Sequence, residues 1–240
     1  MGDNIGYEFI EKTKYPYTSQ SDQDKGFPQP PLAITFPGVG DAIELPPPPE
    51  TPLKQIIDTR ASTRAYQSAP ISQEELSFLL WCTQGIKSYT ETRTRRTVPS
   101  AGARHALETF LLVNRVRGIA PGIYHYVAFQ HALQARVISN TIADDVVAVC
   151  LQQEFIRESA VTFFWVAILE RMVWRYTERG FRYLFLDAGH VCQNLYLSAE
   201  SIGCGACAIG AFDDDRLNDL LGVDGKQKFV VYMAAVGKKP

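Results

Sequence analysis

The chain has 240 residues, of which 46% are hydrophobic and 21% are charged, so it can bury the core of one large domain or two small ones. Its formal net charge of −2 leaves no surplus of lysine and arginine for a polyanionic partner, which argues against nucleic acid. The sequence contains no apolar run long enough to span a bilayer, and Met1–Lys14 lacks the apolar core of a signal peptide, so we expect a cytoplasmic protein with no membrane partner.

Residues 1–52 are expected to form a proline-rich, extended N-terminal arm before a folded domain at residues 53–240. Prolines crowd Phe27–Pro52, and proline lacks the amide hydrogen that helices and central strands need. Apolar side chains within this stretch argue against a purely solvated linker: Leu32, Ile34, Phe36, Ile43 and Leu45. We therefore expect the arm to lie over the domain or over a partner subunit. A partly disordered tail is the alternative.

Capping and turn signals predict a mixed series of helices and strands in the folded domain. Ser72 and Glu75 have the spacing of a capping box, which opens a helix running to about Thr83. Further helices are expected at 54–58, 141–153, 181–202 and 214–221, the last ended by Gly222. Apolar runs predict buried strands at 108–113, 162–169 and 229–236. The order shows no regular βαβ repetition and no second domain boundary.

The first segment that can carry chemistry is Arg60-Ala61-Ser62-Thr63-Arg64. In an extended chain, side chains alternate with a period of two, so the two arginines and Ser62 point to one side. Guanidinium groups present forked donors that fit phosphate oxygens, and a hydroxyl adds a neutral donor. The trio suits a phosphate monoester, and a solvated arginine pair is the alternative.

Two further segments are rich in small residues, which let a backbone approach a flat ligand closely. One is Pro99-Ser100-Ala101-Gly102, flanked by Arg95, Arg96 and Arg104, where a plain turn is the alternative. The other runs from Gly203 to Asp213 and is uncharged before Asp213. No P-loop and no strand-linked dinucleotide fingerprint occurs, so a nucleotide cofactor would need another scaffold.

Five cysteines in such a chain are expected to be reduced thiols, because disulfides persist mainly in oxidising compartments. Cys204 and Cys207 form a C-x-x-C, but a structural zinc needs four ligands and no second C-x-x-C or spaced histidine pair occurs. We expect no metal site. Small core side chains are favoured over a thiol redox pair, which stays open.

Taken in order, the segments resemble the SagB/ThcOx-type branch of the nitroreductase superfamily. The resemblance covers about residues 54–239 and rests on Arg-x-Ser-x-Arg, on Arg-Arg-Thr-x-Pro-Ser-Ala-Gly-Ala, on the run from Arg175 to Leu197, and on Ile-Gly-Ala-Phe-Asp-Asp. It implies an α+β fold with a central mixed β-sheet flanked by helices. It also implies an intertwined homodimer with shared active sites that bind FMN at the subunit boundary.

The resemblance also implies which residues bind the cofactor. Arg60, Ser62 and Arg64 would hold the phosphate and ribityl chain, the 99–102 segment would approach the flavin from the other subunit, and the 209–211 backbone would line the ring. The cofactor-binding positions carried over are Arg60, Ser62, Arg64, Pro99, Ser100, Ala101, Gly102, Ile209, Gly210, Ala211, Lys238 and Lys239. By the same resemblance, Lys238 or Lys239 would reach the phosphate. The alternative is that both are solvated, as adjacent basic residues at a C-terminus usually are.

The function that these features favour is an FMN-dependent oxidoreductase that uses NAD(P)H to reduce quinone-like or nitroaromatic acceptors. The alternative implied by the resemblance is oxidation of peptide azolines (thiazolines or oxazolines) to azoles. A second alternative is a non-catalytic flavin-binding subunit of a peptide-modifying complex.

The sequence departs from the azoline-oxidising relatives at Arg175-Tyr176, the candidate catalytic pair, where those relatives carry a Lys-Tyr pair thought to assist proton removal. A lysine can lose its proton near neutral pH when buried, whereas arginine stays protonated and can only donate hydrogen bonds. The departure favours acceptor reduction over azoline oxidation. Simple packing of the pair on a helix surface is the alternative.

Overall fold

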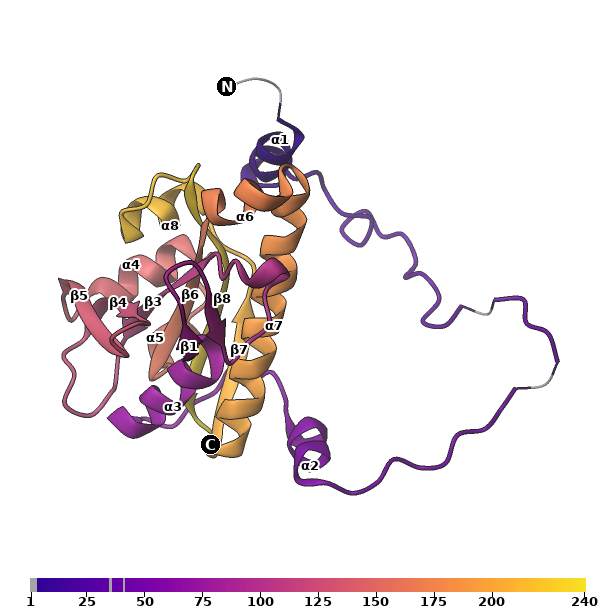
Figure 1. Ribbon diagram of the computed structural model, residues 1–240, viewed down its shortest axis with the longest axis horizontal. Coiled ribbons are helices and arrows are strands. Elements are labelled where there is room, and N and C mark those ends of the chain that lie inside the picture. Colours follow the sequence, from indigo (N-terminus) through magenta and orange to yellow (C-terminus); the bar gives the residue numbers. More distant parts are fainter. Residues whose placement is uncertain (1–3, 35, 41) are drawn as a thin grey trace.

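The computed structural model describes residues 4–34, 36–40 and 42–240, so residues 1–3, 35 and 41 of the expected arm lie outside the described residues. The domain is a three-layer α+β arrangement with one sheet between two layers of helices (Figure 1). The expected α+β class is confirmed. The helices are α1 (Ile5–Lys12), α2 (Pro52–Thr59), α3 (Gln73–Gln84), α4 (Ile142–Val149), α5 (Phe155–Glu158), α6 (Leu169–Tyr176), α7 (Arg179–Ser201) and α8 (Asp214–Leu221).

Six strands form the central sheet in the order β5-β4-β3-β6-β8-β7. They are β3 (Leu107–Val113), β4 (Gly122–Val127), β5 (Ala132–Ile138), β6 (Val161–Ile168), β7 (Cys204–Ile209) and β8 (Lys228–Lys238). All five neighbouring pairs are antiparallel, so the expectation of a mixed sheet is wrong for these strands. Among the described residues, parallel pairing occurs only in isolated bridges such as Ser62 with Ala206. A separate hairpin joins β1 (Ile86–Tyr89) to β2 (Thr94–Arg96).

Strand β6 explains why the sheet needs helices on both faces. Its side chains alternate, so Phe163 and Trp165 enter the core cluster under α3 and α7, whereas Phe164 and Val166 enter the cluster under α4, α5 and α8. Every residue of β6 is buried. A strand covered on both faces reads as a continuous apolar run, and this is why the sequence marks it clearly.

Helix caps confirm two of the expected boundaries. The Ser72 hydroxyl accepts from the Glu75 amide at 3.2 Å and the Glu75 carboxylate accepts from the Ser72 amide at 2.8 Å, so the capping box of α3 forms. Gly222 follows α8 with φ of 67°, the left-handed geometry that stops a helix. The expected strand 162–169 ends one residue earlier, because Leu169 begins α6.

The N-terminal arm is anchored to the domain at both ends of α7. At one end, the Tyr7 ring of α1 meets the Phe181 ring at 5.4 Å, and Lys14 pairs with Asp215 at 2.8 Å. At the other end, α2 packs beside the C-terminal part of α7. The sequence predicted an extended arm, but residues Ile5–Lys12 within it form helix α1.

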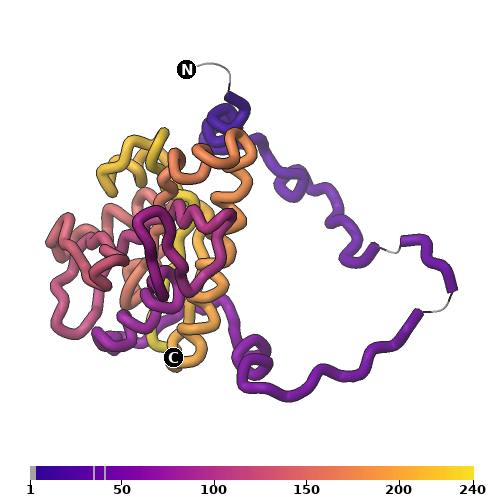
Figure 2. Tube along the Cα trace, viewed as in Figure 1, coloured from indigo at the N-terminus to yellow at the C-terminus, as the bar shows by residue number. Residues whose placement is uncertain are grey.

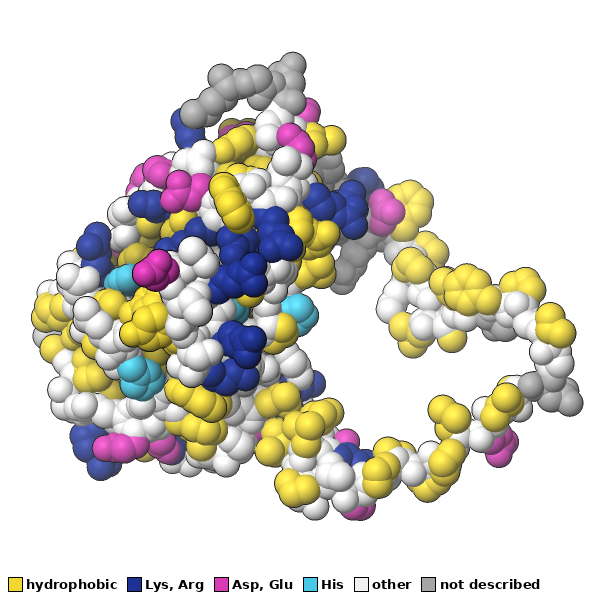
Figure 3. Space-filling view, viewed as in Figure 1, with side chains coloured by type: hydrophobic (Ala, Val, Ile, Leu, Met, Phe, Trp, Pro, Cys, Tyr) yellow, Lys and Arg dark blue, Asp and Glu magenta, His cyan; other side chains and the backbone are white. Residues whose placement is uncertain are grey.

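Between the anchors, the arm loops away from the domain (Figure 2). Its apolar side chains line the loop and face solvent, with Leu32, Ile34 and Phe36 exposed by 93%, 75% and 80% (Figure 3). Between its anchors, the described part of the arm does not cover the domain, so the expectation of an arm lying over its own domain is not met there; the partner subunit and the partly disordered tail stay predictions. Among the described residues, no helix has the length and apolarity to traverse a bilayer.

Candidate functional site

The segment after α2 is extended and is tied to β7. The Thr63 amide donates to the Ala206 carbonyl at 2.9 Å, and Ser62 forms a parallel bridge with Ala206. The two backbones approach so closely that a Cβ on Gly205 would lie 2.5 Å from the Thr63 side chain, so this position of β7 requires glycine. The pairing therefore fixes the direction in which Arg60 and Ser62 leave the backbone.

Tyr196 of α7 connects the first and third predicted segments. Its hydroxyl lies 3.0 Å from the Ser62 hydroxyl and accepts from the Ala208 amide at 2.7 Å. The Arg60 guanidinium lies over the Tyr196 ring, 5.3 Å from its centroid. The Arg64 guanidinium lies 6.0 Å from the centroid of the Phe155 ring, on α5. Arg60, Ser62, Arg64, Tyr196 and Gly210 are called the first half-site below.

The end of β7 leaves room beside its backbone. A Cβ placed on Gly210 would meet only the edge of Tyr232, at 4.0 Å, and Gly210 is exposed. Ile209 is buried, and the Ala211 carbonyl accepts from Gln153 at 2.8 Å. The backbone is thus held in place on both sides of Gly210, and Gly210 itself leaves free space. A backbone surface of this kind suits a flat ring.

The two C-terminal lysines separate from each other. Lys238 pairs with Glu75 of α3, whereas Lys239 pairs with Glu200 of α7 at 2.5 Å. Burial alone would raise the pKa of Glu200, but hydrogen bonds from Lys239 and Thr59 and the charges of Lys239 and Arg60 bring that pKa below its usual value. Lys239 therefore lies on the side of the first half-site, whereas Lys238 is held by α3.

The C-x-x-C pair lies within β7, where residues three apart point to opposite faces of the sheet. Cys204 and Cys207 are both buried, and burial raises the pKa of both thiols. A disulfide between them is incompatible with this strand, which answers the question that the sequence left open. No group of three potential metal-ligating side chains occurs within residues 4–34, 36–40 and 42–240.

The second predicted segment is held by a buried carboxylate on α7. Asp187 accepts from the Ser100 hydroxyl at 2.6 Å and from the Ala101 amide at 3.1 Å, and Ser100 in turn accepts from the His105 amide at 2.9 Å. Burial raises the pKa of Asp187 although both hydrogen bonds act against the rise. The carboxylate therefore fixes a loop in which Gly102 adopts φ of 55°.

Gly102 contacts the candidate catalytic pair. A Cβ at this position would lie 2.4 Å from the Tyr176 hydroxyl oxygen and 3.1 Å from the Arg175 side chain, so glycine is required here as well. The Arg175 guanidinium lies 5.5 Å from the centroid of the Tyr176 ring. Ser100, Gly102, Arg175, Tyr176 and Asp187 are called the second half-site below. Pro99, which precedes them, is exposed.

The two half-sites do not meet within one chain. Asp187 and Tyr196 both lie on α7, nine residues apart, which corresponds to roughly 14 Å along the helix axis. The structure therefore brings the first and third predicted segments together at Tyr196 and the second segment together with Arg175-Tyr176. The two half-sites are therefore separate regions of the described chain.

Sequence reasoning missed the two residues that organise these half-sites. Tyr196 and Asp187 both belong to the motif from Arg175 to Leu197, so the signal was present, but nothing local marks which of its polar residues face inward. Polar residues of a long amphipathic helix are expected on its solvent-facing side, so the sequence alone does not show which of them point inward.

The comparison with known proteins gives a consistent result. The model described as "Nitroreductase family" matches residues 57–238. "Putative nitroreductase MJ1384" of Methanocaldococcus jannaschii is 34% identical over 84% of this chain and 99% of its own length. The trifolitoxin-processing protein TfxB of Rhizobium leguminosarum bv. trifolii is 33% identical over 48% of this chain, but the match spans 32% of that protein.

Among solved structures, the fold is similar to a chain of the Escherichia coli microcin synthetase McbBCD complex with truncated pro-MccB17 bound. The TM-score is 0.67 over 97% of this chain and 86% of that chain, at 20% sequence identity, which shows likeness of fold alone. The peptide-processing relatives agree with the branch that the sequence motifs resemble.

Proposed function

The chain belongs to the nitroreductase family, and from this premise we propose that it is an FMN-dependent oxidoreductase. The observation that carries the proposal is the Tyr196 hydroxyl, which joins Ser62 to the Ala208 amide two residues before the open Gly210. A phosphate-binding edge and a ring-binding edge thereby lie side by side.

The first half-site fits FMN by the chemistry of its donors. The guanidinium groups of Arg60 and Arg64 lie over aromatic rings and form no ion pair with a described carboxylate, so their charges stay available to a phosphate. Ser62 is exposed and adds a hydroxyl. Charge-assisted bonds from such groups suit a terminal phosphate, which FMN has and riboflavin lacks.

Bound FMN would supply the hydride chemistry, and the protein supplies position and electrostatics. Arg60, Ser62 and Arg64 bind the phosphate end, and the 209–211 backbone leaves space for the ring. Asp187 holds the Ser100–Gly102 loop, with which Arg175 is in contact. Arg175 stays protonated, so it can donate hydrogen bonds to a substrate but cannot remove a proton. We propose NAD(P)H as the electron donor and quinone-like or nitroaromatic compounds as acceptors.

We further propose that the complete site forms between two copies of the chain. The outer face of α7 carries Leu186, exposed by 58%, and Gly189, where nothing lies within 4 Å of an added Cβ. The exposed Leu53 and Ile57 of α2 and the apolar side chains of the arm extend this surface. An obligate homodimer buries more than roughly 2,000 Å² in total, so the proposed interface would have to extend over α2, α7 and the arm together.

The central test is a binding titration with three flavins. Purified protein is depleted of any bound flavin and titrated with FMN, riboflavin and FAD, with flavin fluorescence as the readout. FMN should bind tightest, because riboflavin lacks the phosphate. Equal affinity for FMN and riboflavin would remove the role of the arginines, and failure to bind FMN at all would overturn the proposal.

Turnover and mass measurements complete the test. NAD(P)H consumption should require a quinone or nitroaromatic acceptor, and its absence with every acceptor would leave a flavin-binding subunit. Sedimentation should give a dimer, and Leu186→Asp should lose both the dimer and FMN. A monomer that retains FMN would contradict a site built from two chains.

Oxidation of peptide azolines is the second candidate function. The similarity to TfxB and to the McbBCD structure favours it, since both names concern peptide processing. Arg175 argues against azoline oxidation, because its guanidinium group stays protonated and cannot act as a base.

A further inference from the structure

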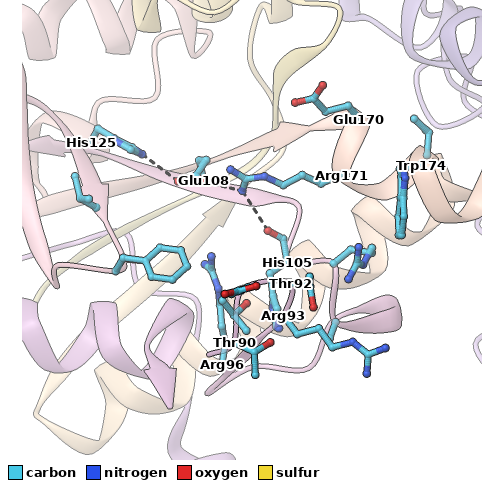
Figure 4. A pocket seen from close by; sticks show the side chains of 18 residues that line it. Thr90, Thr92, Arg93, Arg96, His105, Glu108, His125, Glu170, Arg171 and Trp174 are labelled. Carbon is cyan, nitrogen blue, oxygen red and sulfur yellow. Dashed lines mark hydrogen bonds and ion pairs between the residues drawn. The ribbon is translucent and has the colours of Figure 1, made fainter. Parts of the chain in front are cut away.

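A cavity of about 860 Å³ opens beside the second half-site, between the β1–β2 hairpin, strands β3 and β4, and helix α6 (Figure 4). Its volume falls in the range of small-molecule sites. Helix α6 lines it through Trp174, two residues before Tyr176, which contacts Gly102. The residues after Gly102, namely 103–105, line it as well. The cavity therefore adjoins the second half-site.

The inner wall contains one carboxylate that is already neutralised. Glu108 of β3 accepts from Arg171 of α6 at 2.6 Å and lies 3.0 Å from His125 Nε2 (Figure 4). Burial alone would raise the pKa of Glu108, but the contact with His125 and the charge of Arg171 bring it below its usual value. Glu108 is ionised at neutral pH, and its oxygens are occupied by these two partners.

Arg96 of β2 provides a second positive charge without a carboxylate of its own. Its Nη1 donates to the neutral amide oxygen of Gln84 at 2.8 Å. Its Nε is buried and meets no hydrogen-bond partner in the described part of the chain. Burial lowers the pKa of Arg96. The negative charge of Glu108 acts to raise this pKa, and the positive charge of Arg171 acts to lower it further. An arginine stays charged under these conditions, and Arg96 lines the cavity without an ion pair to a described carboxylate, so its guanidinium charge is available to a ligand there.

The positive charges around the cavity also affect the pKa of His105. Burial lowers the pKa of His105 to about 4, and the charges of Arg96 and Arg104 lower it further against a hydrogen bond that raises it. His105 is neutral at pH 7. Arg96 and Arg171 thus lie around one carboxylate, that of Glu108. The rest of the cavity lining adds two arginines and two glutamates, namely Arg93, Arg104, Glu91 and Glu170. Four arginines against three glutamates leave one surplus positive charge, and a partly buried charge such as that of Arg96 is costly unless an anion pairs with it.

The rim of the cavity is aromatic. Trp174 is exposed by 76% with the Arg104 guanidinium 5.0 Å from its ring, and Phe129 is exposed by 63%. Tyr89 of the hairpin packs against Phe129 with ring centroids 5.5 Å apart. Exposed rings at the mouth of a cavity offer stacking surfaces to a flat apolar group.

We propose that this cavity binds an aromatic carboxylate, with the carboxylate on Arg96 and the ring against the aromatic rim. A guanidinium pairs with a carboxylate through charge-assisted hydrogen bonds, and Arg96, which lines the cavity, supplies such a guanidinium. The claim that this ligand is also the electron acceptor rests on the proposed function. The claim that the cavity binds an aromatic carboxylate does not.

The test compares 4-nitrobenzoate with its neutral isostere 4-nitrobenzamide by titration calorimetry on the full-length protein loaded with FMN. The carboxylate should bind at least tenfold tighter. Arg96→Gln should remove that preference and leave the amide unaffected, and Arg96→Lys should retain part of it. Arg136→Gln, which removes a charge from an exposed position on β5 outside the cavity, should leave the preference unchanged.

A second arm distinguishes a free acid from a peptide terminus. A tripeptide ending in a phenylalanine carboxylate is compared with the same peptide ending in an amide. Preference for the peptide acid over 4-nitrobenzoate identifies the peptide as the source, and the reverse identifies the small acid.

Equal affinity of the acid and the amide, binding of neither, or an unchanged preference in folded Arg96→Gln would each overturn the inference. Turnover separates this result from the proposed function. If the neutral nitro compound is reduced but no carboxylate preference exists, the inference alone fails. If the carboxylate binds through Arg96 and no acceptor is reduced, the proposed function alone fails.

Discussion

The carboxylate of Asp187 accepts a hydrogen bond from the Ser100 hydroxyl at 2.6 Å, so a residue in the middle of α7 holds the loop in which Gly102 adopts φ of 55°. The second oxygen accepts from the Ala101 amide. Both carboxylate oxygens are therefore used to hold the loop, one at Ser100 and one at Ala101.

Asp187→Asn should therefore loosen this loop. An amide keeps one acceptor oxygen and loses the other, which leaves a partner unpaired at a cost of about 1 to 3 kcal/mol. We expect a lower free energy of unfolding in urea and faster trypsin cleavage after Arg104. Asp145→Asn, at an exposed position on α4, is the control and should change neither. Identical cleavage of the three proteins would show that Asp187 does not hold the loop.

Arg60→Ala should weaken FMN binding by about 1.5 to 3 kcal/mol, because it removes a charge-assisted bond to the phosphate. Its affinity for riboflavin should stay the same, since riboflavin has no phosphate. The measurement is fluorescence titration with both flavins, and Arg136→Ala serves as the matched control. A parallel loss of riboflavin affinity would mean that Arg60 acts through folding of the segment instead.

Arg175 should limit azoline oxidation. The protein is expected to reduce a quinone with NAD(P)H but to oxidise a thiazoline peptide slowly or not at all, because Arg175 cannot accept a proton. Arg175→Lys should raise thiazoline turnover relative to quinone turnover, since a lysine can act as a base when its pKa falls. The readout is the ratio of the two rates. Efficient thiazoline oxidation by the natural protein would make peptide dehydrogenation the better assignment.

His105 should make stability depend on pH in a defined window. In the folded protein its pKa lies at about 4, against 6.5 for an ordinary histidine. Between these values the unfolded chain binds a proton that the folded protein does not, so stability is complete above pH 6.5 and falls as the pH drops toward 4. The loss is at most about 3 kcal/mol.

The corresponding variant is His105→Asn, because asparagine tolerates the left-handed backbone that His105 adopts, with φ of 44°. Urea unfolding across this window should show a shallower loss of stability than in the natural protein. If both proteins lose stability in parallel, other groups account for the acid sensitivity.

The sequence predicted the elements whose ends are marked by local chemistry. Helix α3 begins at a capping box and α8 ends at Gly222, so their boundaries were correct to about a residue. Helix α6 was missed because Ile168 gives it no side-chain cap, and the chain passes directly from a buried strand into the helix. Strand β7 was missed because glycine and alanine are depleted in strands.

The candidate site was predictable only in part for a similar reason. From residue types and spacing, the sequence predicted Arg60, Ser62 and the small residues around Gly102 and Gly210 as candidates, and these stay predictions. It did not single out Tyr196 or Asp187, and it named Arg96 only as a basic residue that flanks the second segment, since the role of each depends on a contact between elements far apart in the chain. No local pattern records that Asp187 meets Ser100 or that Arg96 lines a cavity with Arg171.

The double anchoring of the arm has a topological consequence. Helices α1 and α2 attach to the two ends of α7, roughly 33 Å apart by the length of that helix, whereas the intervening residues 13–51 span roughly 130 Å when extended. This surplus length lets the arm form a wide loop between its two anchors (Figure 2). If the proposed second copy lies within this loop, its dissociation requires one anchor to open, so the dimer's dissociation rate would depend on the contact between α1 and Phe181 as well as on the area buried.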